Sequence, residues 1–165
     1  MNGKMRKKFR EVGVGGTFDE LHRGHMALLS EAFEVGGHVL IGLCSDEFVK
    51  KLGKPHLVAS YDQRLEDLRI FLKDHDWLKR ATIVALSDPF GPTLVKGGIE
   101  ALVVSKETEP TAKEINKRRE KAGEPALEVI TIDMIPSENH SPISTTRIRL
   151  GEMDREGHIL KRKND

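Results

Sequence analysis

The chain has 165 residues, of which 38% are hydrophobic and 32% charged, a balance typical of one soluble globular domain. Its 27 Lys and Arg against 26 Asp and Glu leave a net charge of +1, which argues against binding nucleic acid or membranes through overall charge. One cysteine excludes an internal disulfide, and no apolar run reaches the length of about 18 residues that a membrane span needs. We therefore expect a cytoplasmic protein that binds neither nucleic acid nor membranes and has no obligate protein partner.

Apolar runs alternate along the chain with segments of helical periodicity. Strands are predicted at 11–16, 38–44, 81–87, 99–105 and 127–135. Helices are predicted at 24–35, 61–78, 111–122 and 144–150. This alternation predicts an α/β fold, a Rossmann-like doubly wound five-stranded parallel sheet in a single domain. We expect the domain to span 9–160, between an N-terminal tail at 1–8 and a C-terminal tail at 161–165.

Local signals define the first two predicted helices. In the first, apolar residues recur at helical spacing, namely Met26, Leu29, Ala32 and Phe33. Gly36 and Gly37 are expected to stop that helix. Ser60 is predicted to cap the second helix, whose apolar face consists of Leu65, Leu68, Phe71 and Leu72.

In a doubly wound sheet, ligands bind beyond the carboxyl ends of the strands, so the residues after each apolar run are the candidates. The first run leads into "GGTFDELHRGH", where two glycines permit a tight turn and the close approach of a ligand. Thr17 offers a hydroxyl at this turn. His22 and His25 are three residues apart, so they share one face of the helix that begins there. The N-terminus of that helix favours an anion.

Three interpretations of the histidine pair are open at this point: packing or capping residues, a zinc site, or phosphate ligands. No matching Cys or His cluster accompanies the pair, which weakens the zinc interpretation, whereas the glycine turn favours phosphate. Asp19 is interpreted as a cap of the following helix rather than as a residue that orients a histidine. Cys44 is interpreted as a small buried residue rather than a nucleophile.

A second anion signal follows the last predicted strand, in "SPISTTRIRLGE" at 141–152. Three hydroxyl residues at a predicted helix start precede Arg147 and Arg149. Hydroxyls, helix amides and guanidinium groups together suit a polyphosphate, although a capped surface helix with exposed arginines explains this segment equally well. Two such signals together favour a nucleotide triphosphate, and the lack of a Walker lysine motif excludes a P-loop enzyme.

These segments resemble those of a known family. "GGTFDELHRGH" resembles the first signature of the HxGH nucleotidyltransferase superfamily, and "ISTTRIR" resembles its second. With "GLCSDEFVKKLGK", "SDPFGP" and "LVVSKET", they are similar to the archaeal type of phosphopantetheine adenylyltransferase over about 9–160. The resemblance implies that ATP and 4′-phosphopantetheine react, with Mg²⁺ present, to give dephospho-coenzyme A and pyrophosphate. It implies no covalent enzyme intermediate.

The resemblance also implies roles for individual residues. The implied catalytic residues are His22, His25, Thr17 and Lys51. The implied ATP contacts are Gly16, Thr17, Phe18, His25, Lys106, Glu107, Ser144, Thr145, Thr146 and Arg147. The implied acceptor contacts are Lys54, Asp88, Phe90, Gly91 and Ser105. The choice of phosphate-binding lysine among Lys50, Lys51 and Lys54 stays open.

One segment departs from the pattern of the bacterial relatives. "SKE" at 105–107 stands where they carry Arg-Gly-x-Arg, so Lys106 is expected to act as a point charge in place of an arginine. Two further alternatives stay open: the same chemistry on another phosphorylated acceptor, such as FMN or NMN, and a non-catalytic nucleotide sensor or coenzyme A-binding regulator.

Overall fold

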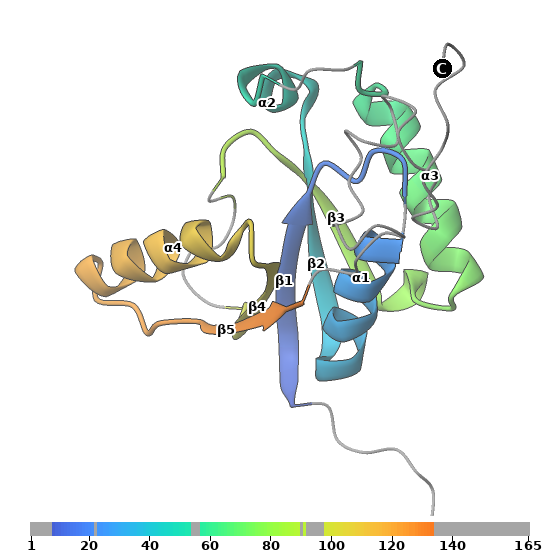
Figure 1. The fold of residues 1–165 in the computed structure, drawn as a ribbon. Coiled ribbons are helices and arrows are strands. Elements are labelled where there is room, and N and C mark those ends of the chain that lie inside the picture. The colour runs from blue at the N-terminus through green and yellow to red at the C-terminus, as the bar shows by residue number, and fades with distance from the viewer. Residues whose placement is uncertain (1–7, 22, 54–56, 90, 92–97, 134–165) are drawn as a thin grey trace, which may run out of the picture.

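The centre of the fold is a sheet of parallel strands in the order β3-β2-β1-β4-β5 (Figure 1). The computed structural model describes residues 8–21, 23–53, 57–89, 91 and 98–133. The strands are β1 (Phe9–Gly16), β2 (Gly36–Cys44), β3 (Ala81–Leu86), β4 (Ala101–Ser105) and β5 (Glu128–Ile132). This strand order is the doubly wound one, which confirms the predicted fold class.

Helices cover both faces of this sheet. They are α1 (Arg23–Val35), α2 (Asp46–Lys51), α3 (Tyr61–Asp74) and α4 (Glu109–Lys121), with a short 3-10 helix, η1, at Leu78–Arg80. In Figure 1, α1 and α3 lie on one side of the sheet and α4 lies on the other. The chain winds from β1 through β2 to β3 and then returns past β1 to β4. Right-handed crossovers in opposite directions place their helices on opposite faces.

The larger core lies between the sheet and the helices α1 and α3. Its buried side chains include Val12, Val14, Leu29, Phe33, Val39, Ile41, Leu68 and Leu72. A smaller cluster under α4 consists of Leu102, Ala112, Ile115 and Leu127. Leu29 and Phe33 confirm the predicted apolar face of α1, but Met26 on the same predicted face is 41% exposed. Met26 belongs to the first turn of α1, which follows β1 at the carboxyl edge of the sheet.

The predicted helix over 61–78 is too long, because α3 ends at Asp74. Asp76 has a φ of 60°, in the left-handed region, and the N–H of Trp77 donates to the carbonyl of Leu72 at 2.8 Å. The Asp76 N–H donates to the Lys73 carbonyl at 3.0 Å, which completes a Schellman motif. The turn brings Trp77 back to stack on Phe33 with ring centroids 4.8 Å apart.

The glycine pair after α1 acts differently from the prediction. The helix does end at Val35, but β2 begins at once with Gly36 rather than at residue 38. A Cβ at Gly36 would lie 2.7 Å from Val12 Cγ2 and 3.1 Å from the Ala32 carbonyl oxygen. Glycine is therefore needed there for close packing of the chain against β1.

Other boundaries shift by a few residues, as expected where strand ends lose their partners. β1 begins two residues earlier than predicted, at Phe9, because it pairs with Gly36 of the extended β2. β3, β4 and β5 are shorter than predicted, and α4 begins at Glu109 rather than at residue 111. Ser60 caps α3 as predicted, accepting the Gln63 N–H at 3.2 Å. The predicted helix at 144–150 lies outside the described residues.

Candidate active site at the carboxyl edge of the sheet

The chain turns sharply where β1 ends. Gly16 is the last residue of β1, and Phe18 follows with a φ of 51°, which is strained for a residue that carries a side chain. The Phe18 ring is 2% exposed, so its burial compensates for the backbone strain. A Cβ at Gly16 would lie 3.3 Å from the ring, so a glycine at this position lets the ring fold back over the strand end. Thr17, the predicted phosphate contact, is half-buried between them.

His25 lies beside this turn. Its imidazole contacts the Phe18 ring, with centroids 5.3 Å apart and planes tilted by 45°. The imidazole is carried by the first turn of α1 and is half-buried. The structure therefore places His25 against Phe18, the residue after Thr17 in the chain, and phosphate binding by these residues stays a prediction. His22 lies outside the described residues, so the relation of the two histidines stays a prediction.

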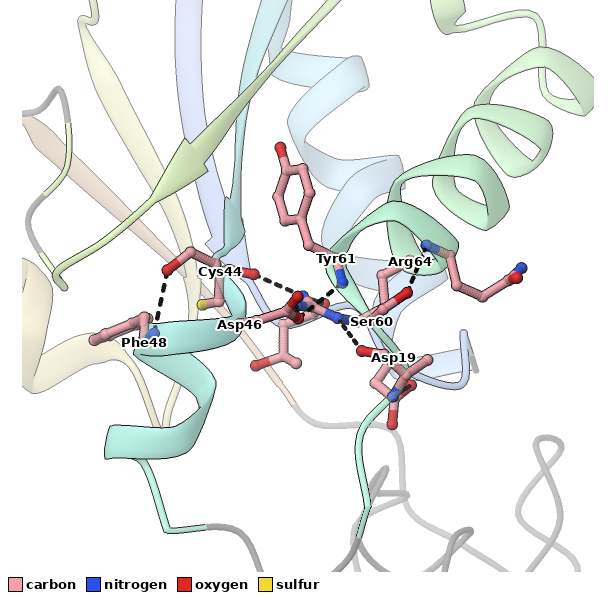
Figure 2. Close-up of polar contacts among 11 residues, drawn as sticks. Asp19, Cys44, Asp46, Phe48, Ser60, Tyr61 and Arg64 are labelled. Atoms are coloured by element: carbon pink, nitrogen blue, oxygen red, sulfur yellow. Dashed lines mark hydrogen bonds and ion pairs between the residues drawn. The ribbon is translucent and has the colours of Figure 1, made fainter.

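A buried arginine joins the ends of β1 and β2. Arg64 of α3 is 1% exposed, and its Nη1 donates to the carbonyls of Thr17 at 2.9 Å and Cys44 at 2.8 Å. Its Nε donates to the Ala59 carbonyl at 2.9 Å, and its Nη2 pairs with Asp46 Oδ1 at 3.1 Å. Figure 2 shows the guanidinium between the end of β2, the start of α2 and the chain entering α3. Burial of Cys44, at 4% exposure, confirms its predicted packing role.

Sequence reasoning missed Arg64, although a signal was present. Arg64 stands four residues before Leu68 and eight before Leu72, both fully buried, so it occupies the apolar stripe of α3. A charged residue within such a stripe must find partners, because an unpaired buried charge is costly. The two aligned leucines thus indicate a buried, hydrogen-bonded arginine.

Asp19 ties the turn after β1 to the chain entering α3. Its side chain is 1% exposed, and Oδ1 accepts the Ala59 N–H at 3.3 Å (Figure 2). Asp46 makes a parallel connection, since its Oδ1 accepts the Tyr61 N–H at 2.8 Å as well as pairing with Arg64. These carboxylates hold the start of α3 against the carboxyl edge. The predicted capping of α1 by Asp19 stays a prediction.

In the loop after β3, the Asp88 side chain accepts a backbone N–H from three residues further along the chain. Asp88 Oδ1 accepts the Gly91 N–H at 2.8 Å, and Gly91 has a φ of 49° that suits glycine. Leu86, at the end of β3, lies over Gly42 of β2, where an added Cβ would be 2.6 Å from Leu86 Cδ1. The Leu86 carbonyl accepts the Ser45 N–H at 2.8 Å, which aligns the ends of β2 and β3. The predicted acceptor residues Asp88 and Gly91 therefore share one turn.

The chain after β2 forms α2, a helix of six residues that Ser45 caps through the Phe48 N–H at 3.1 Å. Lys50 and Lys51 form its last turn, and both are exposed. Neither lysine is set apart by its position, and Lys54 lies outside the described residues. The choice among the predicted phosphate-binding lysines therefore remains open.

The turn after β4 carries the residues that depart from the bacterial pattern. Ser105 ends β4, and its N–H donates to Thr108 Oγ1 at 3.1 Å. Lys106 and Glu107 are exposed, and Lys106 Nζ lies 3.3 Å from Asp133 Oδ1. A pair this exposed contributes little to stability, and anion binding by Lys106 stays a prediction.

Nearby, the Thr131 hydroxyl donates to Glu109 Oε2 at 2.7 Å. This bond, with the hydrogen bond and charge of Lys113, holds the pKa of Glu109 below its ordinary value. Glu109 is thus fixed as an anion at the start of α4, where the helix dipole also favours negative charge.

The parallel sheet places all these strand ends at one edge. Turns after β1, β2, β3 and β4 contribute the described candidates, and strand order reverses between β1 and β4. A crevice at that reversal is where doubly wound folds bind nucleotides. The predicted site residues outside the described part of the chain are His22, Lys54, Phe90, Ser144, Thr145, Thr146 and Arg147. The described segments include no helix long and apolar enough to cross a membrane.

The strand order, with a glycine turn and an imidazole where its first strand ends, is that of a Rossmann-like α/β protein. The model of the cytidylyltransferase-like family matches residues 14–151. Phosphopantetheine adenylyltransferase of Methanothermobacter thermautotrophicus is 46% identical over 158 residues, covering 96% of this chain and 94% of the relative. The enzyme of that name from Methanopyrus kandleri is 44% identical, covering 89% and 92%. The chain belongs to the cytidylyltransferase-like family and, within it, to the phosphopantetheine adenylyltransferases.

A solved structure agrees with this family fold. The crystal structure of a protein of unknown function from Archaeoglobus fulgidus superposes with a TM-score of 0.68 at 30% identity. The superposition covers 81% of this chain and 99% of that protein.

Proposed function

We propose that this chain transfers the adenylyl group of ATP to the phosphate of 4′-phosphopantetheine. An oxygen of the acceptor phosphate forms a bond to the α-phosphorus of ATP. The bond from that phosphorus to the bridging oxygen of the β-phosphate breaks, and pyrophosphate leaves. The products are dephospho-coenzyme A and pyrophosphate, so no redox partner and no covalent enzyme intermediate are needed. The names and high coverage of the archaeal relatives support this reaction.

The observation that carries the proposal is the contact between Phe18 and His25 at the end of β1. It holds an imidazole beside the turn of Gly16 and Thr17, at the strand reversal where nucleotides bind in such folds. An imidazole that donates to an α-phosphate oxygen stabilises the negative charge that develops during transfer. Transfer of this kind depends on positioning and charge stabilisation rather than on a protein nucleophile.

The remaining roles are proposed from the place of each residue at the carboxyl edge. Gly16, Thr17 and Phe18 present backbone and hydroxyl groups to ATP, and Thr17 also meets the acceptor phosphate. Lys51 and Lys106 supply positive charge toward phosphate from exposed positions after β2 and β4. The acceptor arm runs along the turn of Asp88 and Gly91.

Mg²⁺ is proposed to enter as the ATP complex, held mainly by phosphate oxygens and water. Mg²⁺ gives up its water reluctantly and is commonly bound through substrate phosphates. The described side chains form no group of three or more His, Cys, Asp or Glu that would hold a metal, so no protein ligand is assigned to the ion. The proposed step therefore depends on the ion only as part of the nucleotide.

A panel of acceptors tests the reaction and its specificity together. Purified protein is incubated with ATP or CTP and with 4′-phosphopantetheine, FMN, NMN or no acceptor, and pyrophosphate release is followed. The expected result is release that requires both ATP and 4′-phosphopantetheine, with dephospho-coenzyme A identified by mass. The His25→Ala variant serves as the catalytic control.

Other outcomes of the panel contradict the proposal in distinct ways. Release with FMN or NMN but not with 4′-phosphopantetheine would assign another acceptor. Tight ATP binding without pyrophosphate release from any acceptor would indicate a nucleotide sensor instead.

A further inference from the structure

We infer that Arg64 is a positioning residue for adenylyl transfer, acting through the backbone turn after β1. This inference rests on the proposed function. Arg64 belongs to α3. Among the residues proposed to contact substrate, its side chain bonds only Thr17, at the backbone carbonyl. Its effect on the reaction is therefore expected to pass through the placement of that turn.

The guanidinium group joins segments that are far apart in the sequence. It bonds the Thr17 carbonyl 47 residues away and the Cys44 carbonyl 20 residues away, at the ends of two neighbouring strands. A third carbonyl, that of Ala59, and the Asp46 carboxylate complete its partners (Figure 2). The planar group thus sets the positions of the ends of β1 and β2 relative to the start of α3.

The bond to the Thr17 carbonyl also orients the peptide that follows. In a trans peptide the C=O and the next N–H point in opposite directions, so a Thr17 carbonyl aimed at Arg64 turns the Phe18 N–H away from the helix. Phe18 is one of the proposed ATP contacts. Its φ of 51° needs continued support from its surroundings, and the Arg64 bond to the preceding residue provides it.

Stability alone is a weak explanation for this arginine. The free-energy cost of burying a guanidinium group is rarely offset by the attraction of a single ion pair. Apolar residues of similar size at such a position are often equally stabilising. The partner carboxylate of Asp46 is 55% exposed, which weakens the attraction further. Arg64 lies within an apolar stripe, yet its guanidinium group bonds two carbonyls at strand ends. The position that it imposes on these strand ends explains the arginine better.

Lysine cannot reproduce this arrangement. Its ammonium group offers three donors from one nitrogen, whereas Arg64 reaches its partners from three separate nitrogens. Arg64→Lys therefore keeps the positive charge but loses some of the hydrogen bonds that hold the turn after β1. Displacement of a reacting group by about 1 Å can lower turnover about 10²-fold, which sets the expected loss of kcat.

The test compares Arg64→Lys with Asp46→Asn and with the control Arg69→Lys, an exposed arginine on the same helix. For each protein, kcat and both KM values are measured per folded molecule, together with the melting temperature. Arg64→Lys should lower kcat far more than it changes either KM. Asp46→Asn should cause a smaller loss in the same direction, because the amide oxygen can still accept the Tyr61 N–H. Arg69→Lys should match the wild type.

The outcomes separate positioning from a purely structural role. A lower melting temperature with wild-type kcat in Arg64→Lys would overturn the inference. If that variant does not fold, an unchanged kcat in Asp46→Asn would overturn it equally. Failure of the wild type to release pyrophosphate with any acceptor would instead refute the proposed function.

Discussion

The Phe18 ring lies against the His25 imidazole, with centroids 5.3 Å apart, and so couples a strained turn to the start of a helix. Phe18 is buried and His25 is half-buried, so the contact between the rings leaves part of His25 exposed to solvent. An imidazole held in this way is pre-organised, because its contact with the Phe18 ring limits the positions that it can adopt.

Replacement of His25 by Ala should lower kcat about 10²-fold or more, the scale for loss of one transition-state hydrogen bond. The protein should remain folded, because the imidazole is only half-buried. Pyrophosphate release and far-UV circular dichroism check these two expectations. His38→Ala is the matched control, since His38 bonds Thr82 at 2.7 Å and lies well before the carboxyl end of β2. Near-normal turnover in the His25→Ala variant would show that His25 is not a catalytic residue.

Replacement of Gly42 by Ala should destabilise the protein and weaken acceptor binding. The new Cβ would lie 2.6 Å from Leu86 Cδ1 and 2.7 Å from Cγ, so Leu86 must move. Overpacking of this kind costs about 1–3 kcal/mol. Displacement of Leu86 should disturb the neighbouring turn at Asp88 and raise the KM for the acceptor more than that for ATP.

A double-mutant cycle tests this contact directly. Leu86→Ala removes the atoms that collide with the new Cβ, so the double variant should be more stable than the sum of the single losses predicts. Urea denaturation gives the three free-energy differences. Simple additivity would show that the two residues do not interact.

Replacement of Asn116 by Ala should reduce stability without changing turnover. The Asn116 side chain donates to the Leu127 carbonyl at 2.8 Å and accepts the Leu127 N–H at 2.7 Å, holding the entry to β5 on α4. Loss of both bonds should cost about 1–3 kcal/mol, because buried backbone groups lose their partner. Urea denaturation measures it, with the exposed Lys117→Ala as control. Equal stability of the two variants would refute the role of this bond pair.

Replacement of Glu109 by Gln should weaken the pH dependence of stability. The folded pKa of Glu109 is lowered by the Thr131 hydroxyl and then by Lys113, relative to an ordinary value of 4.5. A lowered pKa means that the anion stabilises the fold above that ordinary value and that this contribution is lost as pH falls through the folded pKa.

The stability difference between wild type and Glu109→Gln should therefore be present at neutral pH and shrink in acid below the ordinary carboxyl pKa. Unfolding free energies measured across this pH range check the sign. The exposed Glu120→Gln on the same helix is the control. A difference that grew as pH fell would contradict the assignment.

Much of the fold was predictable because its signals are local. Ser60 caps α3, most of the predicted apolar residues of α1 and α3 lie in the core, and the alternation of strands and helices predicts the doubly wound sheet. The errors arose where tertiary contacts override local pattern. Asp76 ends α3 without a glycine, because the Schellman turn lets Trp77 stack on Phe33.

The residue types of the candidate site could be proposed from the sequence, but the buried hydrogen bonds that hold the turn after β1 could not. The glycine turn and His25 were recognisable from sequence, and the structure brings them together through Phe18. Arg64 was missed because its significance depends on partners in other segments. An arginine on a helix is ordinarily a surface residue, and only a three-dimensional arrangement reveals which carbonyls it binds.

The sequence by itself determined the class of fold and the edge of the sheet where chemistry is expected, since periodicity, glycines and caps act over a few residues. Only the tertiary structure decided that the ends of β1 and β2 share one guanidinium group. The reason is physical: buried hydrogen bonds between distant segments depend on the position of each backbone carbonyl in space, and the packing of the whole domain sets that position.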